Sequence, residues 1–249
     1  MGKYNSATIN QYISSPSGRA NAVNEYFNGL DGVTSELIST DDPFVYNNES
    51  FTGAKIKIDN SNIEIFFGFK TSDVKKTCIY IKNGEVTLYV DSYQYGGDVH
   101  NVVMQSYVEE GCIFLICDHL GINGFEILYV KTRDNKYLIG YNTSRFNTNT
   151  SPYMIDISSL RFEEVSDGVR SPLSYTNMFP FYAIDGELDF LNQAYFKNGN
   201  GLKMFETDIL KECSTVNLLS TVSLPSPLNN YLALGAHCIV PLDDEEVSE

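Results

Sequence analysis

Only three histidines are available as imidazole bases in this sequence: His100, His119 and His237. Nucleophilic catalysis of the Ser-His-Asp kind needs a nucleophile, a base and an orienting acid that meet in space. The sequence contains no Gly-x-Ser-x-Gly elbow, no glycine-rich phosphate loop and no His-Glu-x-x-His motif. These absences exclude the common motif-bearing enzymes. We therefore expect a protein that is not an enzyme, and we assign no catalytic residue.

Side chains of the types that bind zinc are Cys112, Cys117, Asp118 and His119, with His237 and Cys238 near the C-terminus. The spacing of this set matches no known zinc pattern. Neighbouring residues of a strand point to opposite faces, so Cys117 and Asp118 are not expected to converge on one ion. Buried thiols beside a turn histidine are the simpler interpretation. We therefore predict no metal site and no cofactor.

A second group of candidate ligands, Asp185, Glu187 and Asp189, alternates along the chain. On a strand, this spacing places three carboxylates on one face, which could bind calcium or serve in glycoside cleavage. The spacing lacks the EF-hand pattern, and the nearby Phe181, Leu188 and Phe190 fit simple strand alternation. Cation binding here stays open, and a motif-poor, metal-dependent hydrolase is kept as an alternative function.

Aromatic residues make up 13% of the chain, with 17 Tyr, 15 Phe and no Trp. Tyr93, Tyr95 and Tyr107 could form a platform on which sugar rings stack. In a chain so rich in aromatic residues, core and interface packing is the simpler role. A receptor- or carbohydrate-binding β module is therefore a further alternative.

The chain has 249 residues and a formal net charge of −15. Phosphate backbones and anionic membrane surfaces repel such a protein, so we expect neither direct nucleic-acid binding nor membrane association. The five cysteines are scattered, at Cys78, Cys112, Cys117, Cys213 and Cys238. An odd, scattered set fits buried free thiols in a reducing compartment better than a disulfide framework. The polar N-terminus lacks the apolar segment of a signal peptide.

Two short helices are predicted in a helical N-terminal segment, residues 1–32. Ser6 is a candidate cap for the first helix, with Ile9, Tyr12 and Ile13 on one face. Ser15-Pro16 predicts the start of the second helix, as an N-cap followed by proline at the first helical position. Its apolar stripe would consist of Ala20, Val23, Tyr26, Phe27 and Leu30.

From residue 52 to residue 141 the period changes to two, which predicts antiparallel strands. The clearest hairpin is centred on Asn83-Gly84, whose residues tolerate the positive φ of a type I′ turn. Other turns are expected at Asn60-Ser61, Glu110-Gly111 and Asp134-Asn135. We predict a single domain over 1–249, mainly β (α+β): an antiparallel β-sandwich or barrel-like meander with a short helical N-terminal segment.

The C-terminal part, residues 153–249, is mixed in pattern and follows a polar loop at 142–152. It contains a possible short helix near 203–212. Final strands are predicted at Val222–Leu224, Tyr231–Leu234 and Cys238–Leu242.

Three segments resemble virion structural proteins of tailed bacteriophages and prophages, from the tail and neck region. The segments are Tyr12–Val23, Met178–Phe190 and the ending Tyr231–Leu242. They cover a small part of the chain, and none is a diagnostic motif. The resemblance carries no catalytic residues.

The resemblance implies a non-enzymatic component that assembles in multimeric rings at the tail, neck or head–tail junction. Its partners would be copies of itself and neighbouring virion proteins. Its location would be the virion, assembled in the host cytoplasm. A strongly acidic surface suits such a place because it does not bind passing DNA.

Overall fold

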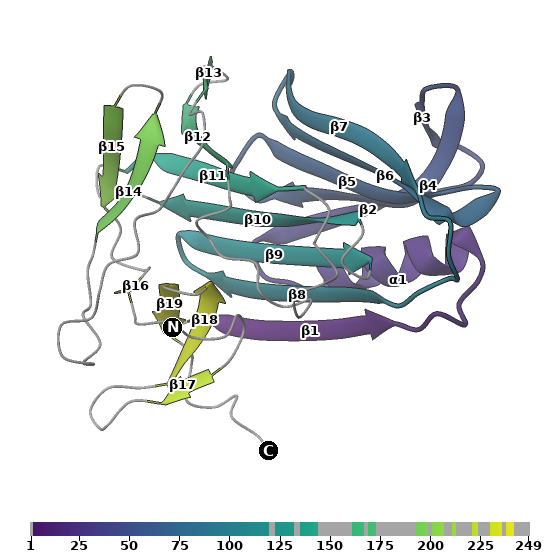
Figure 1. Cartoon of the computed structure of the whole chain (residues 1–249), viewed down its shortest axis with the longest axis horizontal. Coiled ribbons are helices and arrows are strands. Elements are labelled where there is room, and N and C mark those ends of the chain that lie inside the picture. The colour runs from purple at the N-terminus through teal and green to yellow at the C-terminus, as the bar shows by residue number, and fades with distance from the viewer. Residues whose placement is uncertain are drawn as a thin grey trace.

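The computed structural model describes residues 2–119, 123–131 and 135–143, and further along the chain the backbone of eight strands between residues 161 and 241. It is a mainly antiparallel β structure with one short helix, consistent with a β-sandwich, and the sheets do not close into a barrel. The predicted fold class is thereby confirmed, in its sandwich form. Figure 1 shows the two large sheets, with α1 beside them.

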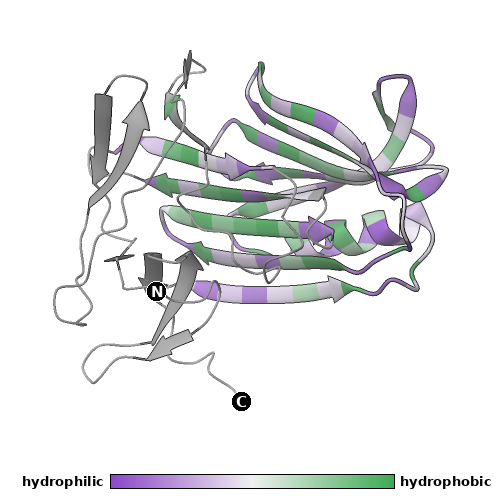
Figure 2. Cartoon of the chain, viewed as in Figure 1, coloured by the Kyte–Doolittle hydropathy of each residue, from purple (hydrophilic) through white to green (hydrophobic). Residues whose placement is uncertain are grey.

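The first sheet has the strand order β1-β8-β9-β10-β11-β12-β13. Its strands are β1 (Lys3–Ile9), β8 (Val102–Glu109), β9 (Cys112–His119), β10 (Asn123–Lys131), β11 (Tyr137–Asn142), β12 (Arg161–Ser166) and β13 (Val169–Pro172). β9 is buried along its whole length, whereas β1 at the edge is mostly exposed. Figure 2 accordingly shows more hydrophobic colour on β9 than on β1.

The second sheet has the order β2-β4-β5-β6-β7, and β3 also pairs with β4. Its strands are β2 (Val33–Ile38), β3 (Phe44–Tyr46), β4 (Glu49–Ile58), β5 (Ile63–Lys70), β6 (Asp73–Asn83) and β7 (Val86–Gln94). Smaller sheets are formed by β14 (Gln193–Asn198) with β15 (Gly201–Glu206), and by β16 (Lys211–Glu212), β19 (Cys238–Pro241), β18 (Asn230–Gly235) and β17 (Thr221–Ser223).

One hydrophobic core joins the two large sheets. It includes Ile56 and Ile65 from the second sheet and Leu115 and Ile127 from the first, all fully buried. The strands alternate, so each sheet contributes the side chains of one face to this layer. Burial of this layer is the main stabilising contribution to the sandwich.

The helix α1 (Pro16–Asn28) begins where Ser15-Pro16 predicts, and it ends before Leu30, the last residue of the expected apolar stripe. Ser15 is the N-cap, and its Oγ accepts a hydrogen bond from the Gly18 amide at 3.1 Å. Val23 and Phe27 are fully buried in the core. The helix packs against β2 and β4 of one sheet and β1 of the other, so it closes one side of the sandwich. Within the described residues, no helix is long and apolar enough to cross a membrane.

The predicted first helix of the N-terminal segment is wrong. Residues Lys3–Ile9 form the edge strand β1, and Tyr4 pairs with Tyr107 of β8. Ile9 is buried, but Tyr12 is 83% exposed in the loop that follows. The helical spacing of these side chains was misleading because pairing with a distant strand supplies the backbone hydrogen bonds that decide the structure.

The region 52–141 is antiparallel as predicted, and the structure divides it between both large sheets, with the crossing between β7 and β8. The hairpin at Asn83-Gly84 is confirmed, but its type I′ turn is wrong. Asn83 pairs with Val86, so Gly84 and Glu85 form the turn. Only Gly84 has a positive φ, of 57°. Glycine at the first turn position is typical of type II′.

The short helix expected near 203–212 is also wrong where the structure describes it. Residues Gly201–Glu206 form β15, which pairs with β14, and Lys211–Glu212 form β16. The expected final strands are present as β17, β18 and β19. Apart from its first residues, the polar loop 142–152 lies outside the described residues.

Candidate functional site

The side chains considered for zinc lie on different faces of β9. Cys112 and Cys117 are five positions apart on a regular strand, so they point to opposite faces at a separation of about 16 Å. Asp118 likewise points away from Cys117 and His119. Among the side chains that the structure describes, no group of three or more that could hold a metal is found. His237 and the triplet Asp185, Glu187 and Asp189 lie outside the described residues, and only the backbone of Cys238 is described.

The described cysteines are buried free thiols, as predicted: Cys78, Cys112 and Cys117. Burial raises the pKa of Cys78 to about 12, and nearby Asp91 adds to the effect. Burial also raises the pKa of Cys117 well above its usual value. Thiols in this state are poor nucleophiles at neutral pH. They are therefore packing groups.

The three tyrosines of the expected sugar platform do not share a surface. Tyr107 is fully buried in β8 of the first sheet, and its hydroxyl donates a hydrogen bond to Glu109 Oε2 at 2.8 Å. Tyr93 belongs to β7 of the second sheet. Tyr95 packs on the ring of His100, with ring centroids 4.9 Å apart. Sugar stacking on this set is therefore not supported by their positions.

The two ends of the sandwich are the places where polar side chains gather. Strands β1, β8 and β9 each have one terminus at either end, as Figure 1 shows. We call the end that holds residues 10–15, Arg19, His100 and His119 the loop end. We call the opposite end, where the turns at 31–32, 59–60 and 110–111 meet, the cleft end.

Arg19 organises the loop end. This side chain is fully buried in the first turns of α1. Its Nε donates to the carbonyl oxygen of Ile13 at 2.7 Å. Its Nη2 donates to the carbonyl oxygens of Gln11 at 3.3 Å and His100 at 2.7 Å. The guanidinium therefore ties the loop after β1 to the segment that connects the two sheets.

Two aromatic rings complete the surroundings of Arg19. Its guanidinium carbon lies 5.7 Å from the centroid of the Phe69 ring, a favourable cation–π position. The His119 ring packs edge-on against Phe69, with centroids 6.3 Å apart. Burial, together with smaller contributions from the charges of Arg19 and His100, lowers the pKa of His119 to about 4. His119 is therefore neutral at pH 7.

Above this buried cluster lies an exposed apolar tip, which we define as Tyr12 and Ile13. They are 83% and 37% exposed. The tip is held by its own turn as well as by Arg19: the Ile13 amide donates to the Asn10 carbonyl at 3.0 Å, and the Gln11 amide donates to Asn101 Oδ1 at 2.7 Å. Tyrosine is one of the residue types that contribute most to binding in protein–protein interfaces.

The cleft end is an open hollow of about 500 Å³. It is lined by Lys3, Asp31, Gly32, Asp59, Asn60, Val108, Glu109, Glu110, Gly111, Cys112, Ile113, Tyr129 and Tyr137. Each of its three turns contains one left-handed residue, Gly32 (φ 69°), Asn60 (φ 56°) or Gly111 (φ 82°). The volume lies within the range of small-ligand and side-chain binding sites.

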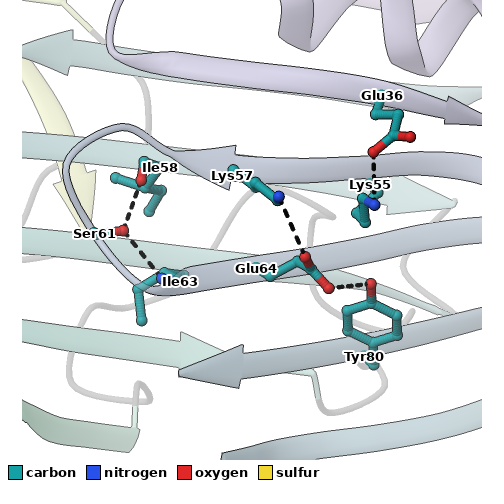
Figure 3. Close-up of polar contacts among 8 residues, drawn as sticks. All are labelled: Glu36, Lys55, Lys57, Ile58, Ser61, Ile63, Glu64 and Tyr80. Atoms are coloured by element: carbon teal, nitrogen blue, oxygen red, sulfur yellow. Dashed lines mark hydrogen bonds and ion pairs between the residues drawn. The ribbon is translucent and has the colours of Figure 1, made fainter. Parts of the chain in front are cut away.

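Backbone hydrogen bonds hold these turns in place. The Asp59 amide donates to the Gly32 carbonyl at 3.0 Å, which joins two turns directly. The Lys131 amide donates to the Gly111 carbonyl at 2.7 Å. Ser61 Oγ donates to the Ile58 carbonyl at 2.7 Å and accepts from the Ile63 amide at 3.1 Å, as Figure 3 shows. These hydrogen bonds fix the positions of the turns that line the cleft.

Charge in the cleft is strongly unbalanced. Four carboxylates line it, those of Asp31, Asp59, Glu109 and Glu110, against the single lysine Lys3. One wall is a stacked pair, Tyr129 and Tyr137, with ring centroids 4.7 Å apart and planes at 10°. Burial raises the pKa of Tyr129 to about 12, so this phenol is neutral at pH 7.

The outer face of the second sheet has a different arrangement of charge. Lys55 Nζ lies 2.6 Å from Glu36 Oε2. Glu64 lies 3.9 Å from Lys57 and accepts a hydrogen bond from the Tyr80 hydroxyl at 2.6 Å. Figure 3 shows these pairs side by side on neighbouring strands. Glu36 and Glu64 are thus paired with lysines, and the same face carries a second buried cluster of Phe51, Phe66, Cys78 and Tyr80. Exposed ion pairs of this kind contribute little to stability.

The sequence predicts turns that line the cleft, but it does not predict that these turns lie close together in space. Turns are predicted at Asn60-Ser61 and Glu110-Gly111, but their spacing does not indicate that they lie together with Asp31-Gly32 at one end of a sandwich. Comparison with known proteins finds no matching protein family, no matching curated protein and no matching solved structure. The geometry of the two ends is therefore the basis for inferring function.

Proposed function

We propose that this protein is a non-enzymatic structural component of a tailed-phage or prophage particle, assembled in a ring with copies of itself at the tail, neck or head–tail junction. The observation that carries the proposal is the rigid, exposed tip at Tyr12 and Ile13. A tip that is both apolar and fixed is costly to leave in water and favourable to bury against a neighbouring subunit.

The tip belongs to the segment Tyr12–Val23, which resembles the start of phage virion proteins. In the structure, this segment forms one unit. Tyr12 and Ile13 are exposed, Ser15 caps α1, Arg19 binds the loop carbonyls, and Val23 is buried in the core. Each part serves to hold the tip in a fixed position, which supports a role in contact rather than in packing alone.

Rigidity matters because association has an entropic cost. A loop that must be ordered on binding loses roughly 0.5–1.5 kcal/mol for each immobilised side chain. Hydrogen bonds to Gln11, Ile13 and Asn10 already order the backbone of this loop. A preorganised tip of this kind suits an assembly that forms many identical interfaces around an axis.

Composition supports the same setting. Free thiols at Cys78, Cys112 and Cys117 are compatible with assembly in a reducing host cytoplasm. A net charge of −15 disfavours direct binding to DNA, as a component beside a DNA passage requires. The proposed partners are copies of the chain and neighbouring virion proteins.

Native mass spectrometry and light scattering of the full chain test the proposal. We expect a closed oligomer whose mass is a multiple of the single-chain mass. Replacing the tip by Tyr12→Ser with Ile13→Ser should weaken assembly at least about tenfold, because buried tyrosines at interfaces contribute about 2 kcal/mol or more.

A matched control is Leu37→Ser with Val45→Ser, which removes two other exposed apolar side chains (39% and 61% exposed). This variant should assemble as the unchanged protein does. A chain that stays monomeric at all accessible concentrations, also with the other proteins of the particle, would overturn the proposal. Equal loss of assembly in both variants would show that the tip has no special role.

A further inference from the structure

The cleft end combines three properties that ordinary surface of this protein does not share. Its walls are fixed by backbone hydrogen bonds between turns, it is concave, and three of its four acids lack an ion-pair partner among the described residues. The acids meant are Asp31, Asp59 and Glu110, which form no ion pair in the part of the chain that the structure describes; Glu109 accepts a hydrogen bond from Tyr107 and is not counted among them. Glu36, Glu49 and Glu64 of the second sheet are each within ion-pair distance of a lysine.

The distribution of these acids indicates what kind of cation fits. A metal ion needs several ligands that converge on one point. The described side chains contain no such group of three, so the cleft carboxylates are spread around the rim instead. Spread carboxylates match an extended ligand that carries its positive charges several ångströms apart.

The remaining lining fits the same ligand. Tyr137 is half-buried and stacks on the buried Tyr129, so an aromatic wall borders the acidic rim. Aromatic ring faces attract ammonium and guanidinium groups. The floor includes Val108 and Ile113, which can contact the methylene stem of a lysine or arginine side chain.

We propose that the cleft end binds a lysine- or arginine-bearing peptide segment of a partner protein. The ammonium or guanidinium groups lie among Asp59, Glu110 and Asp31, and an aliphatic stem packs between the Tyr137 ring and the apolar floor. This binding site goes beyond the assembly role and does not depend on it, because it lies at the end opposite the tip.

Titration of the full chain with a capped tetralysine peptide tests the proposal, with a capped tetraglycine peptide as the comparison. Two-dimensional NMR gives the location of binding. Tetralysine should shift the backbone amides of Gly32, Asn60 and Gly111, and tetraglycine should shift none of them. The affinity should fall as salt rises, because the carboxylates are solvent-accessible.

Two double variants with the same change in net charge separate a built site from general acidity. Asp59→Asn with Glu110→Gln removes two cleft acids and should weaken tetralysine binding about tenfold, since each exposed ion pair contributes up to about 1 kcal/mol. Asp41→Asn with Asp42→Asn removes two exposed acids from the β2–β3 loop and should change the affinity for tetralysine less than about twofold.

Two results would overturn the proposal: tetralysine that binds no better than tetraglycine, or an equal loss of affinity in both double variants. Unchanged thermal melting of both variants confirms that folding is intact. The titration is repeated on the tip variant Tyr12→Ser with Ile13→Ser, so that a failure of assembly and a failure of the cleft are observed separately.

Discussion

The two ends of the sandwich treat charge in opposite ways. At the loop end, Arg19 is fully buried, and its Nε and Nη2 donate to backbone carbonyls, whereas its Nη1 is buried without a hydrogen-bond partner among the described residues. The surface above it is an uncharged apolar tip. At the cleft end, Asp59 and Glu110 are exposed and unpaired among the described residues. One end uses a charge to build structure, and the other presents charge to solvent.

The difference teaches where function is to be sought in a chain without catalytic motifs. A buried, hydrogen-bonded cation makes the structure around it rigid, so its substitution should change the free energy of unfolding. Exposed carboxylates around a hollow contribute little to stability, so their substitution should change the affinity for a ligand rather than the free energy of unfolding. The first end is therefore tested by denaturation and the second by titration.

The largest expected effect is at Arg19. Arg19→Ala removes a fully buried side chain and leaves the carbonyls of Gln11, Ile13 and His100 without their donor. The free energy of unfolding should fall by about 4 kcal/mol, measured by urea denaturation. Arg19→Lys keeps the charge but loses the planar guanidinium group, so its unfolding free energy should lie between those of Arg19→Ala and the unchanged protein. If the unfolding free energy of Arg19→Ala lies within about 0.5 kcal/mol of that of the unchanged protein, Arg19 does not stabilise the fold as inferred.

The next effect depends on pH and involves His119, which is 4% exposed. Its pKa is lowered to about 4 in the folded protein from the ordinary value of 6.5. The unfolded chain therefore binds more protons between pH 6.5 and pH 4, so stability from this group is fully present above pH 6.5 and is lost as the pH falls toward 4. The loss amounts to about 3 kcal/mol.

The His119 effect is isolated by difference, because carboxylates also titrate in acid. The unfolding free energy is measured from pH 7.5 to pH 4 for the unchanged protein and for His119→Gln. The variant should lack the steeper part of the decline. A pKa of His119 near 6.5 by NMR would mean that the loop end opens to water.

The smallest effect is at the cleft end, where Gly32 has a φ of 69°. An added Cβ would meet Ile113 Cδ1 at 3.5 Å, an ordinary contact, so the cost comes from the backbone alone. Gly32→Ala should destabilise the protein by about 1 kcal/mol in the same urea experiment. Gly96→Ala, where a Cβ meets nothing within 4 Å, is the matched control and should be neutral. Equal stability of the two variants would indicate that the cleft turns adjust freely.

Local patterns predicted much of the fold. Ser15-Pro16 marked the start of α1, and the alternation from 52 to 141 marked the strands β4 to β11. These features could be predicted because capping, turn formation and alternation depend on residues close in sequence. The strand β1 could not, since its hydrogen bonds are made with β8 far along the chain.

The candidate sites follow the same division. Turn residues such as Gly32, Asn60 and Gly111 were recognisable, because left-handed backbone favours glycine and asparagine. The burial of Arg19 was not recognisable, since an arginine near a helix start is usually solvated. The Tyr107 side chain, considered for a surface platform, is buried in β8, which lies between β1 and β9 in the sheet. The sequence does not give this strand order.

By itself, the sequence determined the acidity of this protein, the alternation of its strands from residue 52 to 141, the start of α1 and the positions of several turns. Tertiary structure alone decided that β1 is a strand, that the strands divide into two sheets, that Arg19 supports an exposed tip, and that three acidic turns share one cleft. The physical reason is that spacing along the chain fixes local geometry, whereas convergence depends on strand register and on packing between residues that are far apart in sequence.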